Sequence, residues 1–294
     1  MYQGDYDPET TNSCQAVVES NQRISPASTD EVRHLELSID DPAFRFLEGQ
    51  TIGVLVEGPH PFGNRYHHRR YSIANARSAP TEDESVRVSL LVRRCFSIDE
   101  VSGEEYPGLA SNYLCDVRPG DRIAFTGPYG DAFVIPEDPE TNLLMIGTGT
   151  GIAPFRAFIQ HIYEKQPDWR GKVRLFYGAR TGTETLYRND LKDDLTNYYS
   201  RETFEAFEGL SKRPWMDRED TGLSEVLEDN AEAIWELMQE PKTQVYIAGL
   251  PKTAEDFYNA MAEVAGSSAR WRWGRYGRLS MKCAIRQNPL PMAR

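Results

Sequence analysis

The spacing of apolar residues changes once along this 294-residue chain, near residue 137, and that change constrains the fold more than any other feature. Before it, short apolar stretches rich in β-branched residues are separated by Gly, Pro, Asn or Asp, as at 31–39, 49–58, 85–94 and 121–127. Regularly spaced short strands with turn residues between them are typical of an antiparallel barrel or sandwich. The first part of the chain therefore predicts an all-β domain.

After residue 140 the pattern becomes strand, loop and helix in alternation. Residues 142–147 indicate a buried strand and 153–165 an amphipathic helix. Further strands are expected at 173–180 and 244–250, with a long helix within 223–239 between them. Alternation of this kind predicts a parallel sheet covered by helices on both faces.

The acidic, proline-containing link 135–142 separates the two patterns. We therefore predict two domains, residues 1–137 and 138–294, and expect the polar first twelve residues to be mobile. No internal repeat or low-complexity segment interrupts either part of the sequence.

Composition narrows the function. A net charge of −12 disfavours nucleic acid as a partner, because phosphate backbones attract basic surfaces. No apolar run approaches the roughly 20 residues that span a bilayer, and no secretory signal opens the sequence, so a soluble, cytoplasmic protein is expected.

The four cysteines, Cys14, Cys95, Cys115 and Cys283, are widely spaced, which argues against a bound metal or cluster and favours reduced thiols. Residues 266–294 are basic, as either a patch for an acidic partner or a solvated tail.

A glycine-rich turn, Gly147 to Gly151, lies where the first strand of the second part leads into a helix. Glycines let the backbone approach a ligand closely, and the N–H groups at a helix N-terminus favour an anion. The hydroxyls of Thr148 and Thr150 could reach a phosphate or a ribose. The spacing differs from the GxGxxG pattern, so a tight turn without a ligand is the alternative.

Several segments, read in order, resemble the ferredoxin–NADP⁺ reductase family. They are RRYSIA at 69–74, LLVRRC at 90–95, GLASNYLCD at 108–116, GTGTGIAPFR at 147–156 and VYIAGL at 245–250. The chain is most similar to the plant, cyanobacterial and benzoyl-CoA-epoxidase-type members, without a fused ferredoxin domain. The resemblance implies two domains: an antiparallel β-barrel that binds FAD, followed by an α/β parallel sheet that binds NADP.

The resemblance also implies how FAD is held. Arg69 matches an arginine that neutralises the pyrophosphate, Tyr71 a tyrosine on one flavin face, and Ser72 a serine bonded to the ring or ribityl chain. Ser111 matches a serine that reaches toward flavin N5, so Ser111 and Tyr71 are the catalytic candidates. The other positions implied around FAD are Leu91, Val92 and Arg93 near the adenine and ribose, and Gly108, Leu109 and Ala110 around the pyrophosphate.

On the nucleotide side, the resemblance assigns the glycine-rich turn to the pyrophosphate and nicotinamide of NADP(H). Ser211, Lys212 and Arg213 match the pair that binds the 2′-phosphate in NADP-selective members, but the tyrosine that follows it there is missing near 221–222. FAD and NADP(H) are therefore the expected cofactors, with NAD(H) as the alternative. The full set of implied nucleotide contacts is Gly147, Thr148, Gly149, Thr150, Gly151, Gly178, Arg180, Ser211, Lys212, Arg213, Gly249 and Leu250.

The implied activity is hydride transfer between nicotinamide C4 and flavin N5, coupled to a one-electron carrier such as ferredoxin or flavodoxin. A reductase component of an oxygenase system is the alternative within the same class. A catalytically silent flavoprotein or scaffold is the alternative from another class. It is suggested by Ala110 and Ala248, where family members carry cysteine, and by the lack of any aromatic residue after Tyr276.

Overall fold

The structure is a computed structural model and describes residues 13–41, 43–58, 65–78, 85–99, 102–131, 133–217, 220–265 and 284–289. These residues form two compact units. Of the described residues, those up to Val134 and Arg156–Phe158 form one unit, and Ile135–Phe155 and those from Ile159 on form the other. The first twelve residues and most of the basic C-terminal segment, for which expectations were stated above, lie outside the described residues.

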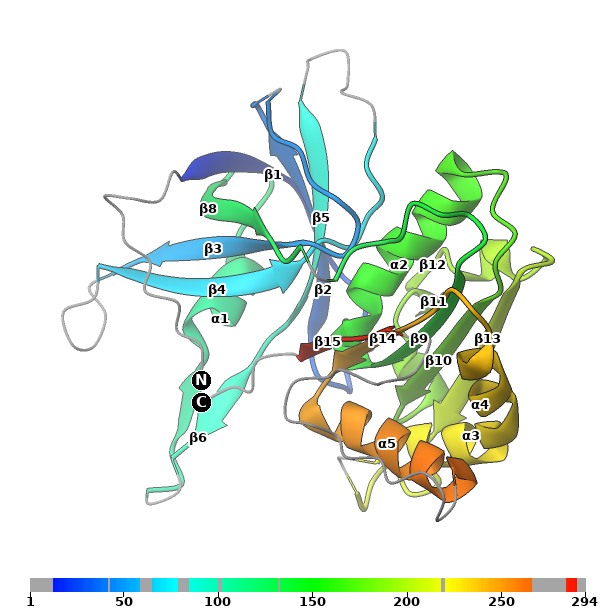
Figure 1. Cartoon of the computed structure of the whole chain (residues 1–294). Helices are drawn as coiled ribbons and strands as arrows, with labels where there is room; N and C mark the ends of the chain where they lie inside the picture. Colours follow the sequence, from blue (N-terminus) through cyan, green and yellow to red (C-terminus); the bar gives the residue numbers. More distant parts are fainter. Residues whose placement is uncertain are drawn as a thin grey trace. The chain divides into compact units, whose positions relative to one another are not determined.

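The first unit is built on a six-stranded antiparallel sheet in the order β4-β3-β8-β1-β2-β5 (Figure 1). A β-bridge between Ile73 and Leu90 and a hydrogen bond from Ala74 N to Ser89 O (2.8 Å) join the two edges and close the sheet into a barrel. Of the two all-β folds that the sequence allows, the barrel is the one formed. Its strands are β1 (Cys14–Arg23), β2 (Val32–Ile39), β3 (Thr51–Glu57), β4 (Tyr66–Ser72), β5 (Val86–Arg93) and β8 (Arg122–Tyr129).

Alternate residues of these strands fill the barrel, as the period of two in a strand requires. Ile52 and Val54 on β3 are fully buried, and Phe125 on β8 packs edge-on against Phe44 with ring centroids 5.6 Å apart. A short helix, α1 (Leu109–Asp116), contributes Leu114 and Cys115 to the same core. The hairpin of β6 (Phe96–Ile98) and β7 (Glu105–Pro107) leads into this helix.

The second unit contains a five-stranded sheet in the order β13-β10-β9-β14-β15, in which every pairing is parallel. Every residue of the central strand β9 is buried, which explains its continuous apolar sequence. The predicted parallel sheet is confirmed. Its strands are β9 (Asn142–Thr148), β10 (Val173–Ala179), β13 (Phe204–Leu210), β14 (Thr243–Gly249) and β15 (Ala284–Pro289).

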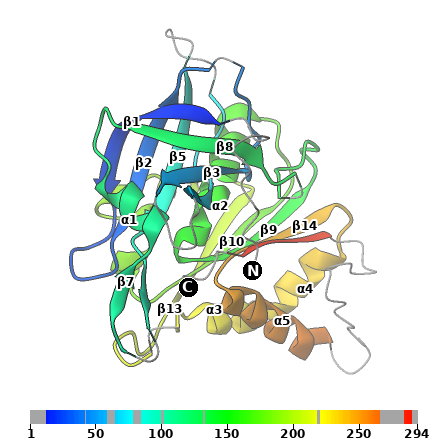
Figure 2. The same ribbon diagram turned by 90° about the vertical axis from the view of Figure 1, so that its left-hand side faces the viewer.

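Helices cover both faces of this sheet (Figures 1 and 2). One face carries α2 (Ile152–Gln160), and the other carries α3 (Leu223–Asp229), α4 (Ala231–Gln239) and α5 (Pro251–Ala265). The long helix expected within 223–239 is divided at Asn230, whose backbone leaves the helical region and whose Nδ2 donates to Val226 O at 2.8 Å. Among the helices that the structure describes, none has the length and apolar character needed to cross a membrane.

Candidate cofactor sites

The N-terminus of α1 is open to an anion in the first unit. The helix begins after Gly108, so the N–H groups of Leu109, Ala110 and Ser111 have no partner within the helix. No described side chain caps this end, and the first turn contains no acidic residue. The first turn of α1 therefore leaves the positive end of the helix dipole without a negative side chain, and this end fits a group such as the FAD pyrophosphate.

Arg94 fixes the position of α1 from the side. Its Nη1 donates to Asn112 Oδ1 (2.9 Å) and its Nη2 to Asp116 Oδ1 (2.7 Å), which are one turn apart on the helix. Its Nε donates to Glu31 Oε2 (2.8 Å) outside the helix, and the Arg94 side chain is only 17% exposed. One guanidinium thus ties α1 to the loop before β2.

Two asparagines hold the ends of α1. Asn112 donates from Nδ2 to Cys95 O and to Gly108 O, both at 2.9 Å, and so holds the turn that precedes the helix. Asn21 donates from Nδ2 to Val117 O at 2.7 Å and to two carbonyls of the last helical turn. The sequence pointed to none of these three side chains. Arg94 and Asn112 lie inside motifs quoted above, but Asn21 gave no signal because its partners are far along the chain.

Strand β4 presents Arg69 and Tyr71 on one face. In the register with β3 they lie opposite Val54 and Ile52, both core residues, and Tyr71 packs against the barrel core. Burial raises the pKa of Tyr71, and the charge of Arg69 opposes this only in part, so the phenol stays protonated. Arg70 points the other way, with its guanidinium 4.2 Å from the centre of the Tyr129 ring.

These elements are neighbours within the first unit, because α1 packs against β3, β4 and β5 (Figure 1). The structure therefore places β4, the strand that carries Arg69 and Tyr71, beside α1. A guanidinium, an aromatic side chain and unpaired N–H groups are what a dinucleotide with a flat ring requires. The described residues fit FAD.

Four of the expected FAD contacts do not all face the same side of the barrel wall as Tyr71. Val92 is fully buried in the barrel core, so only its backbone is available to a ligand, whereas Leu91 and Arg93 point to the other face. Arg93 lies 3.8 Å from Asp30 in an exposed ion pair. Ser72 ends β4 on the face opposite Tyr71.

The Ser111 hydroxyl is engaged by the backbone. Its Oγ donates to Gly108 O and accepts from Cys95 N, both at 3.2 Å, and the residue is 8% exposed. The space beside Gly108 is filled as well, because an added Cβ would lie 2.9 Å from Ser111 Oγ. Ser111 thus shapes the turn that presents the N-terminus of α1.

In the second unit, the glycine-rich turn is shaped by close approach to β14. A Cβ on Gly151 would lie 2.1 Å from Ala248 O, so only glycine lets the turn lie against that strand. Gly149 has a φ of +53°, and no described atom lies within 4 Å of where its Cβ would stand. Its carbonyl accepts from the Tyr177 hydroxyl at 2.9 Å. The turn is fixed from behind and open in front, as a phosphate cradle requires.

Thr148 and Gly249 meet on the far side of this turn. Thr148 Oγ1 lies 2.7 Å from Thr253 Oγ1, so its hydroxyl bonds to the first turn of α5. A Cβ on Gly249, whose φ is +149°, would lie 2.6 Å from both threonine hydroxyls. Leu250, which follows Gly249, is 38% exposed. Thr148 and Thr150 were both expected at the phosphate. Thr148 is buried and bonded to Thr253, whereas Thr150 is partly exposed, so Thr150 is the one whose hydroxyl is available to a ligand.

The remaining nucleotide candidates also lie at the carboxyl ends of strands. Gly178 on β10 leaves room for Thr221, whose Oγ1 would lie 2.7 Å from an added Cβ. Arg180 forms an ion pair with Glu184. Ser211 directly follows β13, and its Oγ donates to Asp220 Oδ2 at 2.7 Å. Because the carboxyl ends of parallel strands meet at one edge of the sheet, all these residues share that edge with the glycine-rich turn.

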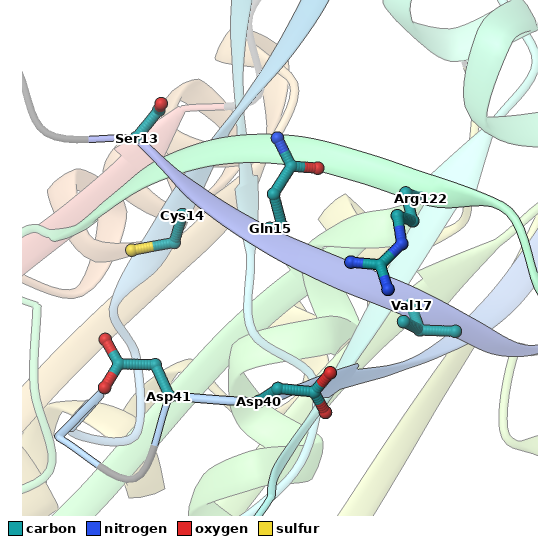
Figure 3. Close-up of a pocket in the computed structure, with 7 residues that line it drawn as sticks. All are labelled: Ser13, Cys14, Gln15, Val17, Asp40, Asp41 and Arg122. Carbon is teal, nitrogen blue, oxygen red and sulfur yellow. The ribbon is translucent and has the colours of Figure 1, made fainter.

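A pocket of about 250 Å³ lies elsewhere, between the start of β1 and the turn after β2 (Figure 3). Its walls include Cys14, Asp40, Asp41 and Arg122, and none of the expected cofactor contacts. Burial and the nearby Asp41 raise the pKa of Cys14, so the thiol is protonated at neutral pH. Two carboxylates in so small a space also disfavour a phosphate, so this pocket is not a cofactor site.

Comparison with known proteins agrees with the two units. The model of an oxidoreductase FAD-binding domain matches residues 15–133, and that of an oxidoreductase NAD-binding domain matches residues 145–259. The matches define the class: an oxidoreductase with one domain for flavin and one for nicotinamide dinucleotide.

Individual relatives identify the family. A ferredoxin–NADP reductase of Thermosynechococcus vestitus is 34% identical over 268 residues, which span 89% of this chain and 68% of the relative. One from Spirulina sp. is 33% identical over 253 residues, 84% of each chain. The ferredoxin–NADP⁺ reductase structure from Plasmodium falciparum has the same fold, with a TM-score of 0.69 at 19% identity over 89% of this chain and 93% of its own. The chain belongs to the ferredoxin–NADP reductase family.

Proposed function

We propose that this chain is an FAD-dependent reductase that moves electrons between NADPH and a one-electron carrier protein. The observation that carries the proposal is the pair of helix N-termini left open to phosphate, one in each unit. Each lies in the domain whose family model is named for the cofactor it would hold. The relatives' names specify NADP and ferredoxin.

In the FAD-binding unit, the N–H groups at Leu109, Ala110 and Ser111 and the guanidinium of Arg69 bind the pyrophosphate, and Tyr71 lies against the flavin. Tyr71, whose pKa burial raises further above neutral pH, contributes a neutral aromatic face. When both are bound, FAD and the nicotinamide supply the hydride transfer between C4 and N5 and the conversion from two-electron to one-electron steps.

The proposed catalytic role of Ser111 is to hold the N-terminus of α1 in place. Its bonds to Gly108 and Cys95 fix the turn in front of α1. Ser72, Leu91 and Arg93 complete the proposed FAD contacts through side chains, and Val92 through its backbone.

In the nucleotide-binding unit, the turn from Gly147 to Gly151 binds the dinucleotide pyrophosphate, and Gly249 and Leu250 lie beside the nicotinamide. Gly178, Arg180 and the Ser211–Arg213 segment serve the adenosine half. The shared edge of the sheet is what supports these roles.

The carrier is proposed to be ferredoxin, with flavodoxin or an oxygenase component as the candidates to be compared, and the protein is proposed to be cytoplasmic. FAD-loaded protein and NADPH would be mixed with equal amounts of a plant-type [2Fe–2S] ferredoxin, a flavodoxin or an oxygenase component. The proposal predicts fast reduction of ferredoxin. Rapid oxidation of NADPH with reduction only of the oxygenase component would assign the chain to an oxygenase system. A yellow protein that reduces no carrier and oxidises no NADPH would be the silent flavoprotein.

A further inference from the structure

In the loop after β13, the carboxylate of Asp220 is bonded to Ser211, the serine that was expected to bind the 2′-phosphate of NADP(H). Ser211 is only 9% exposed, and its Oγ donates to Asp220 Oδ2 at 2.7 Å while it accepts from Arg213 N at 3.1 Å. The other oxygen of Asp220 accepts from Gly222 N at 2.8 Å. The one proton of the Ser211 hydroxyl is therefore committed to a neighbouring anion. A phosphate that took this hydrogen bond would have to displace the Asp220 carboxylate.

One of the two cations that follow Ser211 is paired with a carboxylate as well. Lys212 Nζ bonds to Glu225 Oε1, and Arg213 forms no ion pair with any residue that the structure describes. The two lysines that interact electrostatically with Asp220 are each paired with another carboxylate, Lys212 with Glu225 and Lys252 with Asp256. A phosphate monoester carries a charge of about −1.5 to −2 at neutral pH, so this balance does not favour it.

Asp220 is ionised at neutral pH. The hydrogen bond from Ser211, together with that from Gly222 N, lowers its pKa. An ionised carboxylate accepts hydrogen bonds and donates none, so it suits a ribose hydroxyl and repels a phosphate. In dinucleotide-binding sheets generally, an acidic residue at the ribose selects NAD and a cationic one accommodates NADP.

We propose that Asp220 is a specificity-determining residue of the dinucleotide site: held by Ser211, its carboxylate accepts a bond from the adenosine ribose and opposes the 2′-phosphate, so NADH competes with NADPH as the electron donor. The inference rests on the proposed function only in that a nicotinamide dinucleotide reduces the flavin.

Two measurements on FAD-loaded protein test this inference. Steady-state kcat/KM would be measured for NADPH and for NADH with ferricyanide as acceptor, and Kd for NADP⁺ and NAD⁺ by calorimetry. In the unaltered chain the two kcat/KM values should agree within about tenfold. Asp220→Asn keeps the shape but removes the charge. It should shift both ratios toward the phosphorylated nucleotide by about tenfold or more, through KM rather than kcat.

Two further variants separate charge from folding. Ser211→Ala keeps the carboxylate and should leave both ratios near those of the unaltered chain, which a merely structural role for the pair would not predict. Asp190→Asn removes an exposed carboxylate in the turn between β11 (Arg188–Asn189) and β12 (Lys192–Asp193) and should change neither ratio.

The outcomes distinguish this inference from the function on which it rests. A chain that prefers NADPH by a hundredfold or more, or an Asp220→Asn variant whose nucleotide ratios are unchanged, would overturn the role of Asp220. If neither dinucleotide supports turnover but the Kd ratio still shifts in Asp220→Asn, the proposed function fails and the role of Asp220 stands.

Discussion

The two helix N-termini offered to phosphate are built by opposite means. In the FAD-binding unit, α1 is held by side chains that reach it from elsewhere: Arg94 from the end of β5 and Asn21 from β1. In the nucleotide-binding unit, the turn before α2 depends on glycine, which has no side chain, because Gly151 lies directly against Ala248 O. The first site should fail when a side chain is deleted, and the second when a methyl group is added.

The largest expected effect tests the nucleotide-binding unit. In Gly151→Ala the new Cβ would meet Ala248 O at 2.1 Å, and a backbone atom in a sheet cannot move aside cheaply. We expect a loss of about 2 kcal/mol or more in the free energy of unfolding, together with loss of NADP⁺ binding. Urea denaturation and calorimetry would measure the two effects.

The matched control for that variant is Gly182→Ala in the same unit, where no described atom lies within 4 Å of the added Cβ. It should be as stable as the unaltered chain, or slightly more stable. Equal losses in the two variants would show that close approach to β14 does not explain the need for glycine at 151.

The next effect tests the FAD-binding unit. Arg94→Ala removes three charge-assisted hydrogen bonds and leaves Asn112 Oδ1 without its donor. We expect a loss of about 2 kcal/mol in unfolding free energy and a protein purified with less FAD. Flavin content per chain and thermal unfolding would report it. Arg118→Ala, which removes an exposed arginine just beyond α1, should retain its flavin; if both variants keep full flavin, Arg94 does not position the helix.

A smaller effect tests the face of β4 that meets the flavin. Arg69→Ala should weaken FAD binding about tenfold to a hundredfold, because a charge-assisted bond to the pyrophosphate is lost. Its neighbour Arg70 lies on the opposite face against Tyr129, so Arg70→Ala should leave FAD binding nearly unchanged. Fluorescence of released flavin on dilution gives both Kd values. The reverse order of effects would place FAD on the other face.

The smallest expected effect concerns Ser111. Ser111→Val removes its two backbone bonds and should slow flavin reduction by NADPH about fivefold, with less change in NADP⁺ affinity. Stopped-flow absorbance gives the rate, and Ser97→Val in the β6–β7 hairpin provides the comparison. Identical rates in Ser111→Val and the unaltered chain would remove Ser111 from the catalytic candidates.

The sequence predicted those structural features that depend only on residues close together along the chain. The buried strand β9 and the glycines at 147–151 were recognised because a run of apolar residues and a sharp turn need only neighbours in sequence. The roles of Arg94 and Asn21 were not recognised, because their hydrogen-bond partners come from distant segments that only the folded barrel brings together.

Ser211 and Asp220 at the proposed dinucleotide site also show what the sequence could not predict. Its serine and two cations were noticed as a pattern, but the pattern could not show that Asp220 occupies the serine hydroxyl. The division of one expected helix into α3 and α4 likewise depends on the local backbone of Asn230. The residue types at a site could be predicted from the sequence, but the hydrogen bonds that join them in the fold could not.

The central claim is that one chain holds both cofactors and passes electrons between them. Anaerobic addition of NADPH to FAD-loaded protein, followed by visible absorbance, tests it most directly. We expect the flavin absorbance to bleach within a few seconds and to return when air is admitted. A flavin that stays oxidised, while calorimetry shows that the nucleotide is bound, would contradict it.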